Sequence, residues 1–305
     1  MKIIQNLLLA LFAMLSVDAV ADSRTVYFNG DILTMEGDSP NYVEAIVVTG
    51  DTISFAGEKQ EAVAAAGPKA VLRDLKGHTL LPGFIDSWGH FALVAQNTLG
   101  VNVAYFSENP PTTKAQLIGT LRKEGKPFNG WIVGTGHSDA LLTDGPLSLA
   151  DLDNAFPKQP VLIANISTLT GMVNSAGLKK LGITKSTKAV SGFIPLDPKT
   201  EELTGELIGM PYLNAVTKAV GRCSQDLTLK TYRKAEQIYV SNGFTTAQSY
   251  EATVDDVRTM RLAVEKKVVS LDLIALPTFD IVNQLLNTTP IFNSGFIAVA
   301  IGASK

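Results

Sequence analysis

The sequence predicts an α/β protein in which a small β-rich domain precedes a parallel sheet with helical crossovers. Residues 22–80 contain short apolar runs separated by tight turns, which is typical of hairpins. After residue 81 the pattern changes to apolar strands that alternate with amphipathic helices. This alternation favours a parallel sheet, either an open doubly wound sheet or a (β/α) barrel. No G-x-G-x-x-G segment follows a strand, so the sequence does not indicate a nucleotide-binding version.

The composition argues against several classes of function. The chain has 305 residues, of which 46% are hydrophobic and 18% are charged, enough to fill a large core. The formal net charge of -3 does not suggest binding to nucleic acid or to an anionic membrane. Cys223 is the only cysteine, so no intramolecular disulfide can form, and we expect a buried, inert thiol.

Residues 1–21 have the pattern of a secretory signal peptide. A basic start is followed by an apolar run over residues 3–15 and by the small residues of Ala19-Val20-Ala21. The apolar run is too short for a comfortable membrane span, although an uncleaved N-terminal anchor is the alternative. We expect cleavage after Ala21 and export, to a bacterial periplasm.

The β-rich domain is expected to contain two hairpins. Asn29-Gly30 separates two apolar runs within residues 25–35, and this dipeptide favours a tight hairpin turn. A Thr-Gly-Asp turn divides residues 44–57 in the same way. The other elements expected in this domain are a short helix over residues 60–66 and an alternating segment over residues 70–84.

The second domain is expected over residues 81–305. Its predicted buried strands are 131–137, 160–167, 244–250 and 270–276, and a further strand-like run covers 295–305. Its predicted helices are 113–124, 148–155, 172–181, 227–242, 253–267 and 279–287, with Ser148 and Asp255 near two helix starts. About five or six barrel-type strands fit this length, whereas a full barrel needs eight, so we expect the sequence to be truncated.

Five segments resemble the amidohydrolase superfamily, and within it the amidohydrolase-3 branch. They are LPGFIDSWGHF (81–91), GWIVGTGHSDALL (130–142), the long run 147–183, LTGELIG (203–209) and NGFTTAQ (242–248). The resemblance implies an incomplete TIM-like (β/α) barrel preceded by part of a composite β-sandwich. It also implies metal-dependent hydrolysis of amide or other carbon–nitrogen (non-peptide) bonds in small-molecule substrates.

The resemblance also implies a divalent metal, with zinc as the expected ion. The family takes its first two ligands from a His-x-His pair on the first barrel strand. His90 matches the second histidine, but Trp88 stands in place of the first, and an indole offers only an N–H donor. Leu169 stands where many relatives carry a histidine, and Lys305 matches a lysine that bridges metals in some relatives. His90 and Lys305 are therefore the candidate metal ligands, and the catalytic residues stay unassigned.

The candidate substrate pocket contains Trp88, His137, Asp139 and Gln248. His137 and Asp139 lie in a loop-like segment after a predicted strand. Gln248 ends another predicted strand, where barrel strands deliver side chains to the active face.

Several polar residues have two interpretations. Alternation would place Asp86 on the same strand face as His90, where it either fixes an imidazole or satisfies backbone amides. Asn174 and Ser175 are expected to cap a helix rather than to contact substrate. Glu206 either supplies a carboxylate to the site or simply follows a turn. The remaining histidine, His78, is expected to be a surface turn residue.

Three hypotheses about function remain open at this point. The first is a secreted metal-dependent amidohydrolase. The second is a binding or scaffold protein in which Trp88 fills the metal space and favours apolar or planar ligands. The third is a degenerate product without function, whose exposed sheet edges would favour self-association.

Overall fold

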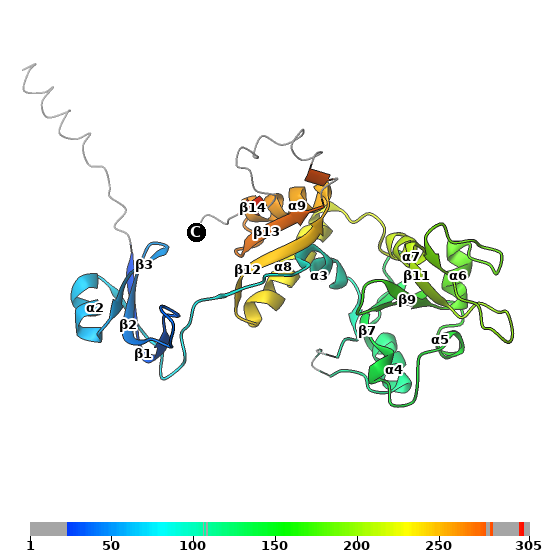
Figure 1. Cartoon of the computed structure of the whole chain (residues 1–305), viewed down its shortest axis with the longest axis horizontal. Coiled ribbons are helices and arrows are strands. Elements are labelled where there is room, and N and C mark those ends of the chain that lie inside the picture. The colour runs from blue at the N-terminus through cyan, green and yellow to red at the C-terminus, as the bar shows by residue number, and fades with distance from the viewer. Residues whose placement is uncertain (1–22, 106, 108, 279–280, 283–298, 302–305) are drawn as a thin grey trace, which may run out of the picture. The chain divides into compact units, whose positions relative to one another are not determined.

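The structure, a computed structural model, describes residues 23–105, 107, 109–278, 281–282 and 299–301. It divides into two units, with the boundary after Gly83, and each unit is described by itself (Figure 1). The expected signal segment and Lys305 lie outside the described residues, as does most of the helix expected over residues 279–287. Among the residues described, no helix is both long enough and apolar enough to cross a bilayer.

The first unit is a four-stranded sheet with the order β3-β2-β1-β4 and one helix on a face. Its elements are β1 (Arg24–Leu33), β2 (Tyr42–Thr49), β3 (Thr52–Gly57), α2 (Lys59–Ala66) and β4 (Val71–Asp74). Buried alanines of α2 pack on small apolar side chains of β1 and β2, which lie side by side with α2 in Figure 1. A sandwich needs two sheets, whereas the described residues of this unit form a single sheet. The β-sandwich therefore stays a prediction.

The hairpin predicted over residues 44–57 is confirmed, because β2 and β3 pair antiparallel around Gly50 at φ 60°. The hairpin predicted over residues 25–35 is wrong, because β1 continues through this segment with only a register shift. Asn29 adopts φ 61°, and a Cβ on Gly30 would lie 2.2 Å from the carbonyl oxygen of His78. Long-range pairing on both sides of β1 therefore turns the Asn-Gly dipeptide into an irregularity within one strand.

The first sheet of the second unit has the order β10-β11-β9-β8-β7-β6. Its strands are β6 (Val101–Asn102), β7 (Ile132–His137), β8 (Val161–Asn165), β9 (Thr170–Val173), β10 (Gly192–Phe193) and β11 (Glu206–Gly209). One face carries α4 (Lys114–Glu124) and α5 (Leu149–Ala155), and the other carries α6 (Ser175–Leu181) and α7 (Met210–Val220). β6, β7 and β8 are parallel, whereas β9, β10 and β11 are added antiparallel.

The second sheet of this unit has the order β14-β13-β12-β5. Its elements are β5 (Phe84–Ile85), α3 (Phe91–Asn97), α8 (Gln225–Ser241), β12 (Phe244–Ala252), α9 (Val254–Glu265), β13 (Asp272–Pro277) and β14 (Val299–Ile301). β5, β12 and β13 are parallel, and β14 is antiparallel to β13. The three helices share one core with β12 and β13, in which Phe91, Met260 and Leu273 are fully buried.

Most of the elements predicted for this unit are confirmed, but the purely parallel sheet is wrong. The helix predicted over residues 172–181 begins only at Ser175, because Thr170–Val173 form the antiparallel strand β9. The described strands of this unit form two separate sheets. β5 pairs with β12 in one sheet, and β6 is the edge strand of the other, where it pairs with β7 and not with β5. The incomplete barrel therefore stays a prediction.

A fully buried asparagine ties β8, α5 and α6 together. The Asn174 Oδ1 accepts hydrogen bonds from the backbone N–H groups of Val161 (2.9 Å) and Gly177 (3.0 Å). Its Nδ2 donates to the carbonyl oxygens of Phe156 and Gln159, both at 2.8 Å. The predicted helix cap is thus confirmed, and the same side chain also satisfies three backbone groups outside the helix.

We expect Asn174→Ala to lower the free energy of unfolding by roughly 3 kcal/mol or more, because buried partners lose their hydrogen bonds as well as the cap. Urea denaturation followed by circular dichroism measures the change. Ser224→Ala is the matched control, since Ser224 caps α8 from an exposed position with one hydrogen bond to the Leu227 N–H. It should cost about 1 kcal/mol. Equal losses in the two variants would contradict the network role.

Candidate functional site

The histidine of the LPGFIDSWGHF segment lies where β5 turns into α3. β5 ends at Ile85, and His90 immediately precedes α3 and forms an isolated bridge with Ser249 of β12. The Tyr250 N–H donates to the Gly89 carbonyl at 2.8 Å, which fastens the turn to β12. His90 thus follows the carboxyl end of β5 and lies beside the carboxyl-terminal half of β12.

The Trp88 side chain does not point at an empty ligand position but stacks on an aromatic neighbour. Its ring lies 4.4 Å from the Tyr250 ring, with an angle of 28° between the planes. The His90 ring meets the same tyrosine edge-on at 5.8 Å and 82°. Trp88 is 67% exposed, so this aromatic cluster of Trp88, Tyr250 and His90 presents a flat apolar surface to solvent.

Asp86 supports the turn rather than the imidazole. Its Oδ1 accepts the Trp88 N–H at 3.3 Å, and its Oδ2 accepts the Tyr239 hydroxyl of α8 at 3.0 Å. Burial and the nearby Asp86 carboxylate raise the pKa of the Tyr239 hydroxyl, which keeps it a donor. The expectation that Asp86 and His90 share a strand face is wrong, because β5 ends at Ile85, before either residue.

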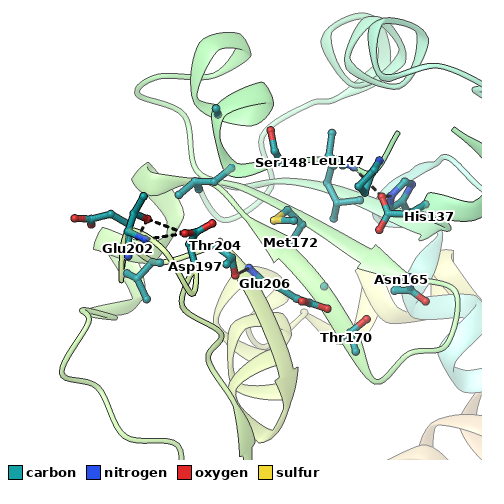
Figure 2. A pocket seen from close by; sticks show the side chains of 18 residues that line it. His137, Leu147, Ser148, Asn165, Thr170, Met172, Asp197, Glu202, Thr204 and Glu206 are labelled. Carbon is teal, nitrogen blue, oxygen red and sulfur yellow. Dashed lines mark hydrogen bonds and ion pairs between the residues drawn. The ribbon is translucent and has the colours of Figure 1, made fainter. Parts of the chain in front are cut away.

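Two other predicted pocket residues, His137 and Asp139, line a hollow of about 450 Å³ on the six-stranded sheet (Figure 2). His137, 5% exposed, ends β7, and its Nε2 donates to the Asp139 Oδ1 at 3.0 Å. The same Oδ1 accepts the Leu147 N–H at 2.9 Å. Because an ionised carboxylate only accepts, the ring nitrogen that faces it, Nε2, carries a proton.

Glu206 also lines this hollow, whereas Gln248, Leu169 and Cys223 do not. Gln248 lies within β12, paired in register with Ile274, and Tyr250 follows it on the same strand face. Leu169 is exposed in the turn before β9, and Cys223 is half-buried, with burial raising the pKa of its thiol. Tyr250 is the site residue that sequence reasoning did not single out. The alternation of β12 beyond Gln248 was the signal that could have found it.

The described residues do not fit the expected metal. Among them, no group of three His, Cys, Asp or Glu side chains could hold a metal ion. Trp88 is engaged with Tyr250 and has no lone pair to offer, so His90 has no imidazole partner on this turn. A protein zinc site usually takes at least three protein ligands.

Comparison with known proteins places the chain in a family. Residues 71–294 match the family model described as "Amidohydrolase family". The chain belongs to the amidohydrolase family. The putative amidohydrolase YtcJ of Bacillus subtilis (strain 168) is 28% identical over 230 residues, which cover 73% of this chain and 40% of the relative. The N-substituted formamide deformylase of Arthrobacter pascens is 26% identical over 186 residues, which cover 60% of this chain and 32% of that enzyme. The chain thus spans well under half the length of these relatives.

Solved structures of two metal-dependent hydrolases share the fold. An uncharacterized metal-dependent hydrolase from Pyrococcus furiosus aligns with a TM-score of 0.61 at 16% identity, over 87% of this chain and 52% of that one. Its counterpart from Pyrococcus horikoshii OT3 gives 0.60 at 19% identity, over 87% and 50%. At these identities the likeness concerns the fold alone.

The helix beside the hollow begins with a capping box that responds to pH. Ser148 and Asp151 exchange hydrogen bonds at the start of α5, and Lys114 lies 3.1 Å from the Asp151 carboxylate. Burial alone would raise the pKa of Asp151, but hydrogen bonds from Ser148 and Lys114 outweigh it and lower the pKa. The stabilisation is therefore complete above the unfolded-state pKa and is lost as the pH falls through the folded-state value.

We expect Asp151→Asn to be less stable than the parent at pH 7, with the difference shrinking as the pH falls below about 4. Urea titrations at several pH values between 7 and 3 measure the two curves. Asp226→Asn, in the first turn of α8, is the control, because its carboxylate has no capping-box contact. A stability difference that stays constant down to pH 3 would refute the assignment.

Proposed function

We propose that the protein acts on small molecules containing a carbon–nitrogen bond and that its function is hydrolysis of that bond. The family match over residues 71–294 supports this proposal. The observation that carries it is the position of His90, which follows the carboxyl end of β5 in the segment that resembles the family's first ligand strand. Active sites of barrel enzymes lie at the carboxyl ends of their strands.

The described residues contribute a substrate-facing surface to this function and not a metal centre. A divalent metal would supply an activated water and would polarise the scissile carbonyl. Since the ligand set found here does not fit such an ion, no step of the reaction is derived through it. The turn orients two rings. Asp86 accepts a hydrogen bond from the Trp88 backbone N–H, and the Tyr250 ring contacts the side chains of Trp88 and His90.

Trp88→His in the unaltered chain should not give zinc-dependent hydrolysis, because a His-x-His pair alone falls short of a zinc site. A fusion that also appends the part of the Bacillus relative that this chain does not span should give it. Turnover of N-substituted formamides and N-acyl amides, with and without zinc, measures both. The matched control is the same fusion carrying Trp88→Phe, which keeps an aromatic ring without a lone pair.

Zinc-dependent turnover by Trp88→His alone would show that the described residues do supply the remaining ligands. A folded fusion with Trp88→His that binds zinc without hydrolysing any of these amides would overturn the hydrolytic proposal.

A second candidate function, binding of a planar small molecule without catalysis, is favoured by one observation. Trp88 and Tyr250 form an exposed stacked pair at the position where the family resemblance implies a metal ligand. An exposed aromatic face attracts flat apolar or cationic molecules.

Tryptophan fluorescence tests this candidate directly, because the chain has only two tryptophans. Trp88 is 67% exposed and Trp131 is 1% exposed, so a ligand on the aromatic cluster should quench Trp88 and leave Trp131 unchanged. A panel of planar aromatic amides should give saturable quenching that disappears in Trp88→Leu. Quenching that persists in Trp88→Leu, or none in the parent chain, would remove the binding role of the cluster.

A further inference from the structure

The hollow on the six-stranded sheet has an apolar floor between two polar ends. Ile163 of β8 and Met172 of β9 are paired in register, and Glu206 of β11 is paired with Met172 on its other side. These three residues line the same hollow together with Gly171. The floor between the two ends is therefore a thioether, a branched aliphatic chain and bare backbone.

The polar groups around this floor are acidic. Four of the lining residues are carboxylates, Asp139, Asp197, Glu202 and Glu206, and none of the lining residues is a lysine or an arginine. Three of these carboxylates already have donors within the protein. Asp139 accepts from His137, Asp197 from the backbone of its own turn, and Glu202 from Lys185.

Glu206 is the exception. Its backbone N–H donates to Thr204, but its half-buried carboxylate has no hydrogen bond or ion pair with any residue that the structure describes. Figure 2 shows this carboxylate pointing across the sheet toward the side of the hollow that carries Thr170 and Asn165. A partly desolvated carboxylate without a donor gains more from a bound cation than a fully hydrated one.

The opposite end of the hollow carries a second carboxylate, that of Asp139. The Nε2–H of the buried His137 donates to Asp139, and the His137 Nδ1 has no partner among the described residues. The second oxygen of Asp139, Oδ2, likewise accepts no described hydrogen bond. A ligand group with positive charge is favoured beside this carboxylate.

Three strand spacings separate the two ends of the hollow across the sheet. β7, which carries His137, and β11, which carries Glu206, have β8 and β9 between them. His137 also pairs with Asn165, two residues farther along β8 than Ile163. Three strand spacings across and two residues along amount to roughly 16 Å between the backbones, and the side chains shorten the gap that a ligand must bridge. One ammonium group cannot reach both ends, whereas a short chain with a cation at each end can.

We propose that this hollow binds an elongated organic dication, a small alkyl diamine with one ammonium group at Glu206 and the other at Asp139 and His137. The methylene chain lies over Met172 and Gly171, where it removes apolar surface from water. This site is on a different sheet from the aromatic cluster, and the proposal does not rest on the hydrolytic function.

Isothermal titration of the full chain with cadaverine, at low ionic strength and again at 150 mM salt, tests the proposal. Pentylamine is the matched probe with one cation, and it should bind roughly tenfold more weakly, because a charge-assisted hydrogen bond contributes about 1.5 kcal/mol or more. Glu206→Gln should weaken cadaverine by a similar factor and leave pentylamine binding at the other end unchanged. Glu124→Gln, an exposed glutamate at the end of α4, should leave both affinities unchanged.

Thermal melting of each variant confirms that it is folded, and Glu206→Gln is the decisive one, since the Glu206 carboxylate supports no described contact. Equal affinities of cadaverine for the parent and Glu206→Gln would overturn the proposal. So would equal affinities for cadaverine and pentylamine, or the absence of saturable binding to the parent chain.

Discussion

The arrangement of Trp88, His90 and Tyr250 in the aromatic cluster depends on one constraint, the parallel pairing of β5 with β12. The Phe84 N–H donates to the Gly243 carbonyl at 2.8 Å, and the Asp86 N–H donates to the Thr246 carbonyl at 3.0 Å. These bonds join segments that are about 160 residues apart in the chain, and they set the register of everything that follows β5. A slip of one residue would turn Trp88 away from Tyr250 and would move His90 off its bridge with Ser249. The identity of the residue at position 88 then decides the chemistry of the turn. With an indole there, the register produces an aromatic stack.

The two candidate regions of the second unit differ in their physical character. The aromatic cluster is exposed and flat, and one histidine edge borders it. The hollow on the six-stranded sheet is concave and acidic, and the His137 Nε2 donates to Asp139 at one end of it. Their different surfaces imply different ligand groups, a planar ring for the first and ammonium groups for the second.

Local signals in the sequence predicted local structure well. Gly50 marked the β2–β3 turn, Ser148 marked the start of α5, and Asn174 marked the cap of α6. The failures have a common cause, since each depends on a partner far along the chain. Asn29-Gly30 is typical of a hairpin turn, but here β4 pairs with the other side of β1 and keeps the dipeptide within one strand. The short run before Ser175 reads as helix because periodicity cannot separate a four-residue antiparallel strand from a helix start. Within the sites, the His137–Asp139 contact follows from a spacing of two residues, whereas the Trp88–Tyr250 stack requires the β5–β12 register.

The turn after β5 presents an aromatic stack, and the described residues around it form no metal centre. Calorimetric titration of zinc into the full-length chain, with His90→Ala titrated in parallel, tests it most directly. We expect no saturable one-to-one zinc binding in the micromolar range and no difference between the parent chain and His90→Ala. Tight one-to-one binding by the parent chain that His90→Ala abolishes would contradict it, because it would show that further ligands complete a metal site around His90.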